Sequence, residues 1–292
     1  MSTYKRRFGD RKDGRLVRSL SPFNKFMPYI MPTRNDRCNQ YEESFEVSSV
    51  DRELRRLRVE GHKGIGILHF LIAAYVRCVS MLPGVNRFVA GRRVYAADRI
   101  SVVLTVKRSL SIDATETTIK VYFEPTDTIF DVYRKINEKI EEVKASDSNN
   151  NTEDVAEALC HLPRFLLRAA VAVLRALDYF GLLPESITDA SPFHGSMIIT
   201  DLGSLRIGPI YHHIYNFGTL PVFIAFGAKR HTYELDKNGN FVDRKYLDCK
   251  MVMDEGTVDG HYYAQFLLAY RYLFQHPEIL EAPPSRVVDD IY

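Results

Sequence analysis

Long uncharged apolar runs are absent from this sequence. No stretch approaches the roughly 20 apolar residues that a helix needs to cross a bilayer, and Met1 to Arg18 is basic and polar, without the apolar centre of a signal peptide. We therefore expect a soluble, cytoplasmic protein that has no membrane among its partners.

Cysteine is also scarce, and several short motifs are missing. The four cysteines are far apart and form no CxxC or Cys/His cluster: Cys38, Cys78, Cys160 and Cys249. Because disulfide frameworks and zinc sites need such spacings, we predict reduced thiols and no bound metal. The sequence contains no GxSxG, and Gly64-Ile65-Gly66 lacks the third glycine of a nucleotide-binding loop.

The net charge of +2 is small, but it is unevenly distributed. Up to Arg37 the chain has ten Lys or Arg residues against three acids. Such a basic arm, residues 1–36, could contact nucleic acid or an anionic cofactor. Since no RNA- or DNA-binding module follows it, nucleic acid is the less favoured partner, and we predict a solvated arm or a segment that contacts another subunit.

With 46% hydrophobic residues, the rest of the chain can form a core. Ile65 to Met81 is apolar on most sides, which predicts a buried central helix that contains His69 and ends before Pro83. The Asn-Gly pair at 238–239 predicts a hairpin turn. Strands are predicted at residues 41–49, 92–95, 100–107, 117–123, 196–200, 221–226 and 246–253, and further helices at 49–59 (with Ser49 as N-cap), 129–143, 155–183 and 260–274.

Residues 144–185 combine a polar run with an apolar helix. Lys144 to Asp154 is rich in Ser, Asn and Asp and predicts a loop. In the following helix Arg164, Arg168 and Arg175 share one face, which favours a packed amphipathic helix over a membrane anchor. The mixed order of strands and helices predicts an α/β (α+β) sandwich around one sheet, with a domain at 37–282 and a tail at 283–292.

Four blocks of the sequence, taken in order, resemble a known family. They are LPGVNRFVAGRRVY (82–95), HGSMIITDLGSLRIGPIYHH (194–213), PVFIAFGAKR (221–230) and a strand that runs into DEGTVDG (254–260), followed by HYYAQF and HPEILE. Together they are similar to the chloramphenicol acetyltransferases and the dihydrolipoyl acyltransferase catalytic domains, whose motifs include TISNLG and DHRxxDG. The resemblance covers about Asp36 to Ala282, and residues 144–185 look like an expansion.

This resemblance implies a chloramphenicol acetyltransferase-like fold, in which helices cover one face of a mixed sheet. It also implies a homo-oligomer, most simply a trimer with active sites between subunits, and it leaves a larger cage open. The family's reaction transfers an acyl group through a tetrahedral intermediate, so the resemblance implies coenzyme A, as acyl-CoA, and a small-molecule acyl acceptor. Hydroxyl, thiol and amine acceptors all remain open.

The site residues follow position by position from the same resemblance. The signature histidine, which is the family's general base, is replaced here by Glu255. Asp259 matches the signature aspartate, which in the family is structural and pairs with an N-terminal arginine; Arg18 and Lys25 are the candidates here. Thr200 matches a serine that stabilises the oxyanion, and the alternative for Thr200 is a strand-end hydroxyl bonded to backbone.

Two adjacent histidines, His212 and His213, could replace the missing base. Because neighbouring residues in an extended segment point to opposite sides, at most one would face the site, and each could equally be structural. His194 and His261 are similar candidates. The alternative function is a catalytically inactive trimeric scaffold, which is favoured by Glu255, by Gly256 at the signature's arginine and by the absence of a lipoyl domain.

Overall fold

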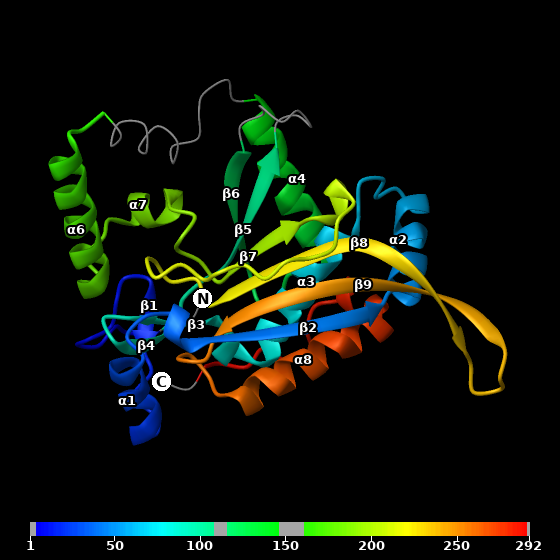
Figure 1. The fold of residues 1–292 in the computed structure, drawn as a ribbon, viewed down its shortest axis with the longest axis horizontal. Coiled ribbons are helices and arrows are strands. Elements are labelled where there is room, and N and C mark those ends of the chain that lie inside the picture. Colours follow the sequence, from blue (N-terminus) through cyan, green and yellow to red (C-terminus); the bar gives the residue numbers. More distant parts are fainter. Residues whose placement is uncertain (1–3, 108–115, 146–160, 291–292) are drawn as a thin grey trace.

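A six-stranded mixed sheet forms the centre of the molecule (Figure 1). The structure, a computed structural model, describes residues 4–107, 116–145 and 161–290, so all but the first two residues of the predicted loop at 144–154 and the predicted helical residues 155–160 lie outside it. β7 runs parallel to its neighbours β8 and β5, and the other pairs are antiparallel. In spatial order the strands are β2 (Cys38–Glu46), β9 (Phe241–Asp254), β8 (Val222–Leu235), β7 (Met197–Asp201), β5 (Ile100–Lys107) and β6 (Glu116–Phe123).

Helices cover one face of this sheet, which we call the helical face. They are α2 (Ser48–Val59), α3 (Ile67–Met81), α4 (Ile129–Ala145) and α8 (Gly260–Gln275). The strands alternate as a half-covered sheet requires: Met197 and Ile199 of β7 join the core under the helices, whereas Ile198 points to the opposite face. The predicted sandwich is therefore confirmed.

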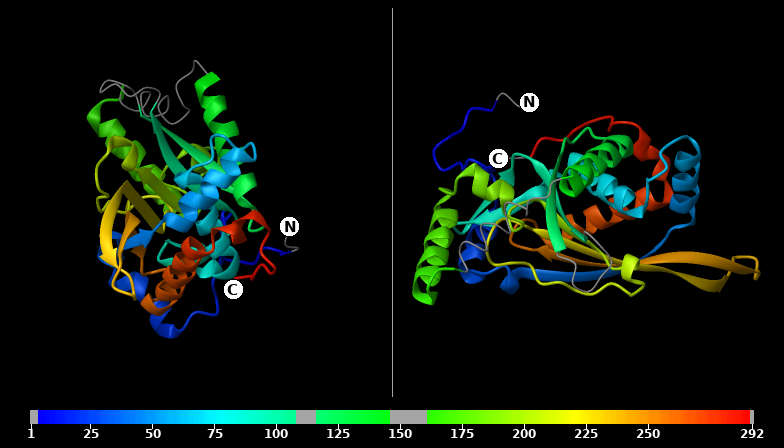
Figure 2. Two further views of the ribbon diagram at one scale, coloured as in Figure 1. Left: turned by 90° about the vertical axis from the view of Figure 1, so that its right-hand side faces the viewer. Right: turned by 90° about the horizontal axis from the view of Figure 1, so that it is seen from above.

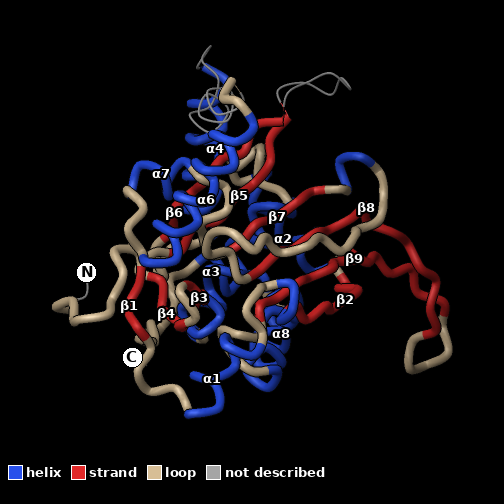
Figure 3. Tube along the Cα trace, turned by 60° about the vertical axis from the view of Figure 1, so that its left-hand side comes forward, coloured by secondary structure: helices blue, strands red, loops and turns tan. Residues whose placement is uncertain are grey.

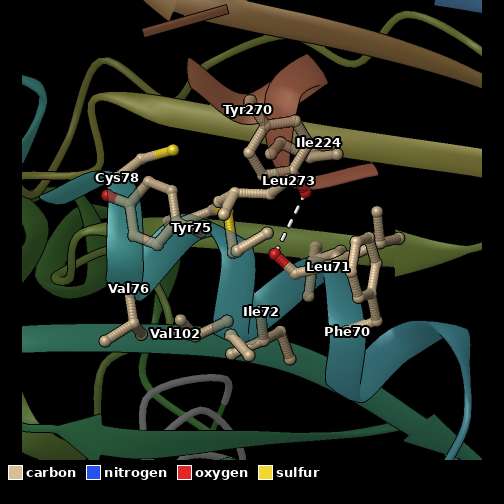
Figure 4. Packing of buried hydrophobic residues seen from close by; sticks show 14 of the residues in the cluster. Phe70, Leu71, Ile72, Tyr75, Val76, Cys78, Val102, Ile224, Tyr270 and Leu273 are labelled. Atoms are coloured by element: carbon tan, nitrogen blue, oxygen red, sulfur yellow. Dashed lines mark hydrogen bonds between the residues drawn. The ribbon is translucent and has the colours of Figure 1, made fainter. Parts of the chain in front are cut away.

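The helix α3 lies at the middle of the core, as its apolar sequence predicts (Figure 4). Its side chains pack against Val102, Ile224 and Leu273 from two strands and α8. Buried tyrosines keep their hydroxyls partnered: Tyr270 donates to the Leu71 carbonyl at 3.0 Å (Figure 4), and Tyr75 donates to the Ser196 carbonyl at 3.2 Å. These bonds remove the cost of burying a hydroxyl without a partner.

The opposite face of the sheet, which we call the second face, is covered only in part. Ile214 and Leu220, from the irregular segment 206–220, pack against Val103, Ile198, Phe223 and Val252. The same segment also exposes apolar side chains, among them Ile207 and Ile210. Part of the second face is therefore open to solvent in a single chain.

The N-terminal segment is folded onto the domain and is not the solvated arm that its charge predicts. β1 (Gly14–Leu16) pairs with β4 (Arg93–Ala97), which pairs with β3 (Arg87–Ala90) in a small separate sheet (Figure 3). The helix α1 (Pro22–Ile30) follows. Arg11, Arg34 and Arg37 are buried because each finds carboxylate or carbonyl partners, which a sequence of basic residues does not reveal.

Two features project from opposite ends of the molecule (Figure 2). The hairpin of β8 and β9 is longer than predicted, and its tip turns at Asp236 to Gly239 as predicted, with Gly239 at φ +83°. At the other end stands α6 (Arg164–Phe180), connected through α7 (Glu185–Ala190) to β7. In the described residues, no helix is both long and apolar enough to span a membrane.

The start of α2 differs from its prediction. Val47, not Ser49, holds the N-cap position, and because valine has no hydrogen-bonding side chain, the Glu46 carboxylate accepts from the Ser48 amide at 2.9 Å instead. Short 3-10 turns complete the fold: η1 (Asn35–Arg37), η2 (Pro83–Asn86), η3 (Gly203–Leu205) and η4 (Pro277–Glu281).

Candidate active site

The carboxyl end of β9 carries a buried ion pair. The Asp254 carboxylate is fully buried and accepts two bonds from the Arg37 guanidinium, at 2.8 and 3.0 Å. Arg34 lies at 3.6 Å from the same carboxylate, and the Gly256 amide donates to it at 2.9 Å. Planar two-point pairing of this kind fixes orientation as well as charge. It anchors the turn between β9 and α8 to the N-terminal segment.

The rest of the turn is held by hydroxyl groups. The Asp254 carbonyl accepts from Thr257 Oγ1 at 2.8 Å and from the Tyr263 hydroxyl at 3.0 Å. Tyr263 is buried, and burial raises the pKa of its hydroxyl, so the group stays neutral and donates. The residues on both sides of Glu255 are therefore locked in place.

Glu255 itself points away from this buried network. Its amide donates to the Arg37 carbonyl at 2.9 Å, and its side chain is exposed in the single chain. Glu255 directly follows Asp254, the last residue of β9, and its place in a cleft between subunits stays a prediction. The carboxylate is held on a rigid turn but is not enclosed by its own chain.

Asp259 has a different role from the predicted one. Its carboxylate accepts from the Tyr262 amide at 2.9 Å and caps α8, and its side chain is exposed. Arg18, proposed as its partner, binds Asp10 at 3.0 Å instead. The arginine–carboxylate pair that fixes this turn is formed by Arg37 and Asp254. The sequence does not predict this pair, although Asp254 is the first residue of the DEGTVDG motif.

Thr200 lies on the second face of the sheet, half-buried near the end of β7. Within the described part of the chain its hydroxyl makes no hydrogen bond, so it is available to a ligand. Across the sheet it is level with Ala225 and then Lys250, whose ammonium lies 4.6 Å from the centre of the Tyr211 ring. Thr200 is therefore half-buried on the second face, in line with a cation two strands away.

Glu255 and Thr200 do not meet within one chain. β8 lies between their strands, and Thr200 is level with Lys250, five positions before Glu255. With ~4.8 Å between strands and ~3.3 Å per residue, their Cα atoms are roughly 19 Å apart. A site that uses both groups needs a second copy of the chain.

The two adjacent histidines point in different directions, as predicted. The His212 ring stacks on Phe223 with centroids 4.3 Å apart and planes 5° apart, and His213 is exposed and meets Tyr215 edge-on. Burial, together with the neighbouring His213, lowers the pKa of His212. His212 is thus held neutral against the second face.

One chain also contains a wide cleft of about 1080 Å³ between β5, β6, the N-terminal segment and the C-terminal tail. Lys120 lines it and donates to the Thr188 carbonyl at 2.6 Å, and burial lowers the pKa of its amine to about 8. None of the residues predicted for catalysis, Glu255, Thr200, Asp259, His212 and His213, lines this cleft. The candidate site and the cleft are therefore separate.

His194, a weaker candidate from the sequence, belongs to a buried network at the cleft wall. Its Nε2 lies 3.3 Å from the Asp178 carboxylate, and its Nδ1 lies 2.8 Å from the Ser191 hydroxyl. Burial opposes ionisation of Asp178, but bonds and charge from His194 and Arg11 lower its pKa to about 2. Arg11 donates to Asp178 across 167 residues of sequence, and this bond joins α6 to the N-terminal segment.

The fold is shared with known acyltransferases. No protein-family model and no curated protein sequence matches the chain. A probable dihydrolipoamide acetyltransferase from Listeria monocytogenes is similar with a TM-score of 0.58 at 12% identity, over 88% of this chain and 93% of that one. A chloramphenicol acetyltransferase gives 0.54 at 12% identity, over 88% and 97%. The cubic core of the pyruvate dehydrogenase complex gives 0.51 at 13%, over 95% and 94%.

Identities this low demonstrate the fold, not the activity. They confirm the chloramphenicol acetyltransferase-like sandwich that the collinear motifs predict.

Proposed function

We propose that this chain, which has the fold of chloramphenicol acetyltransferase, is a CoA-dependent acyltransferase whose site forms between two copies. Glu255 of one copy would act as the general base, and Thr200 of the next as an oxyanion donor. The observation that carries the proposal is the buried Arg37–Asp254 pair, which holds the exposed Glu255 on a rigid strand end. A surface carboxylate whose only role is to keep the protein soluble would not need a buried ion pair to fix its position.

The chemistry assigns one step to each group. Glu255 takes the proton of the acceptor's thiol, hydroxyl or amine as that atom attacks the thioester carbonyl of acyl-CoA. The Thr200 hydroxyl donates to the oxyanion of the tetrahedral intermediate. The intermediate then collapses, the carbon–sulfur bond breaks, and the CoA thiolate receives the proton from Glu255. The products are the acylated acceptor and free CoA.

A carboxylate is an effective base for such acceptors only where burial raises its pKa toward neutrality. Glu255 is exposed in the single chain, so a second copy has to supply that burial. The partly open second face, with Ile207, Ile210 and Thr200, is the surface we assign to this contact. Trimers are the arrangement we propose, because three identical contacts of this kind close into a ring.

The first prediction concerns Glu255. With acetyl-CoA and a panel of thiols and alcohols, Glu255→Gln should lower the rate of CoA release by about a hundredfold or more, since it removes the base but keeps the size. Glu255→His, which restores the family residue, should keep or raise the rate. CoA release is followed with a thiol reagent under matched protein concentrations.

Glu234→Gln, on the distant and exposed part of β8, is the matched control and should leave the rate unchanged. Full activity of Glu255→Gln would move the base elsewhere and overturn the assignment. The unfolding temperature of each variant shows whether a lost rate reflects a lost fold.

The second candidate function is an inactive scaffold with the same assembly. The observation that favours it is the exposure of Glu255, which leaves the carboxylate hydrated unless another copy covers it. Acetyl-CoA separates the two candidates, because a ligand that binds the folded state raises the unfolding temperature. No shift at millimolar acetyl-CoA would favour the scaffold.

A further inference from the structure

The helix α6 packs against the domain along one side, as an amphipathic helix does, and its other sides are exposed. Only a narrow side of it, from Leu167 through Leu174 to Asp178, is turned toward the domain, and Asp178 is its one buried residue. Ala170 and Leu177 are half-buried on the same side, and the other side chains of α6 are exposed at the end of the molecule opposite the β8–β9 hairpin (Figures 1 and 2). α6 has 17 residues, and the question is what its exposed side chains contact in the functional protein.

The outward side of α6 is apolar. At 100° per residue, the outward positions form one stripe that contains no charged residue. The stripe consists of Phe165, Ala169, Ala172, Val173, Ala176 and Phe180, and all six are exposed. Phe165 and Phe180, at its two ends, are 70% and 69% exposed. Apolar side chains of this size gain free energy only when something covers them.

A second group of exposed apolar side chains lies on α1, at the same end of the molecule (Figure 1). The β3–β4 turn lies between the two helices: Gly91 is packed against the Tyr179 carbonyl of α6, and the Arg92 guanidinium lies 5.7 Å from the centre of the Tyr29 ring. α1 exposes its own apolar side chains on this end of the molecule, Phe23, Phe26, Tyr29 and Ile30. We call these residues and the α6 stripe the end patch.

A row of arginines borders the end patch. Arg164, Arg168 and Arg175 lie within about 40° of one another around α6, next to the apolar stripe. All three are exposed, and within the described residues none has a carboxylate partner. The only acid on α6 is Asp178, which is buried and bound to Arg11 and His194.

We propose that the end patch docks on an anionic lipid bilayer, with α6 lying in the headgroup region. The combination of an apolar stripe, terminal aromatic residues and a flanking arginine row is that of an interfacial helix. The charge argues against a second copy of α6 as the occupant, because that helix would bring three more arginines and no free carboxylate. Lipid phosphates supply the missing negative charge.

The test measures sedimentation of the whole protein with vesicles. Vesicles of equal parts phosphatidylglycerol and phosphatidylcholine should bind it, phosphatidylcholine vesicles should bind it far less, and salt should weaken the binding. Phe165→Ser with Phe180→Ser should lower the partition coefficient by roughly tenfold or more. Replacing the three arginines by Gln should lower it by roughly fivefold for each charge.

The matched control removes two equally exposed aromatic residues from the opposite end. Tyr233 and Phe241, at the hairpin tip, are 75% and 82% exposed, and Tyr233→Ser with Phe241→Ser should bind vesicles like the unmodified protein. Circular dichroism checks that every variant is folded.

Two results would overturn the proposal. One is equal binding by the α6 variants and the unmodified protein, or no binding to anionic vesicles at all. The other is a smaller assembly for Phe165→Ser with Phe180→Ser in light scattering without lipid, which would make the end patch a contact between copies.

Discussion

At the scale of single residues, position 256 explains how the turn after β9 differs from the family signature. A Cβ atom on Gly256 would lie 2.5 Å from Arg37 Nε and 3.0 Å from the Asp254 carboxylate. A side chain therefore has no room there, and Arg37, from the N-terminal segment, fills the space instead. The lack of a side chain at position 256 is therefore a condition of the Arg37–Asp254 pair and does not by itself indicate a lost site.

The Arg37–Asp254 pair leads to a prediction about stability. Arg37→Met should lower the free energy of unfolding by about 3 kcal/mol or more, because it leaves a buried carboxylate without its two-point partner; Arg34, at 3.6 Å, compensates only in part. Urea denaturation measures the change. Arg56→Met, which removes an exposed arginine that also pairs with carboxylates, is the control and should barely move the midpoint. Equal midpoints for the two variants would contradict the anchoring role of Arg37.

At the scale of elements, the start of α3 makes stability depend on pH. His69 Nδ1 accepts from the Gly66 amide at 3.1 Å, and the ring meets Tyr133 edge-on. Burial lowers the pKa of His69 to about 4. As the pH falls, the unfolded state therefore binds a proton near pH 6.5, whereas the folded state binds one only near pH 4. Stability should therefore be full above pH ~6.5 and fall by up to about 3 kcal/mol as the pH drops to ~4.

His69→Gln, which keeps a side chain that can bond the amide, should flatten this decline. The check is the urea midpoint measured at pH 7 and at pH 4.5. The exposed His261→Gln should keep the full decline. Asp178 does not confuse the result, because the stability its lowered pKa provides is lost only below pH ~4, as the pH falls toward 2.

The central elements could be predicted because their patterns are local. The all-round apolar α3 and the alternating β5 and β7 carry their burial in their own residues. The outer half of the β8–β9 hairpin was missed because its side chains face water on both sides and show no apolar alternation. The burial of Arg37 does not follow from its own sequence, because its partner Asp254 is 217 residues away and only the fold brings the two together. The order of the motifs predicts that Glu255 follows a strand, but it does not predict which side chains surround that position.

At the scale of the whole molecule, the distance between Glu255 and Thr200 predicts complementation between inactive variants. Glu255→Gln and Thr200→Ala should each lose nearly all activity. The rate of Thr200→Ala should fall by about a hundredfold, because it lacks the oxyanion donor. If each site takes Glu255 from one copy and Thr200 from the next, co-expressing the two variants should produce sites in which both residues are intact. Random assembly of equal amounts gives half times half, so about a quarter of the unmodified activity should return.

The comparison is between co-expressed and separately purified variants, with the mass of mixed assemblies confirmed by differently sized tags. A chain that carries both substitutions, co-expressed with Glu255→Gln, is the control and should restore nothing, because it contributes neither residue. Mixed assemblies that stay inactive would contradict the shared site, because Glu255 and Thr200 cannot meet within one chain either. The intrachain cleft lined by Lys120 would then be the next place to test for substrate binding.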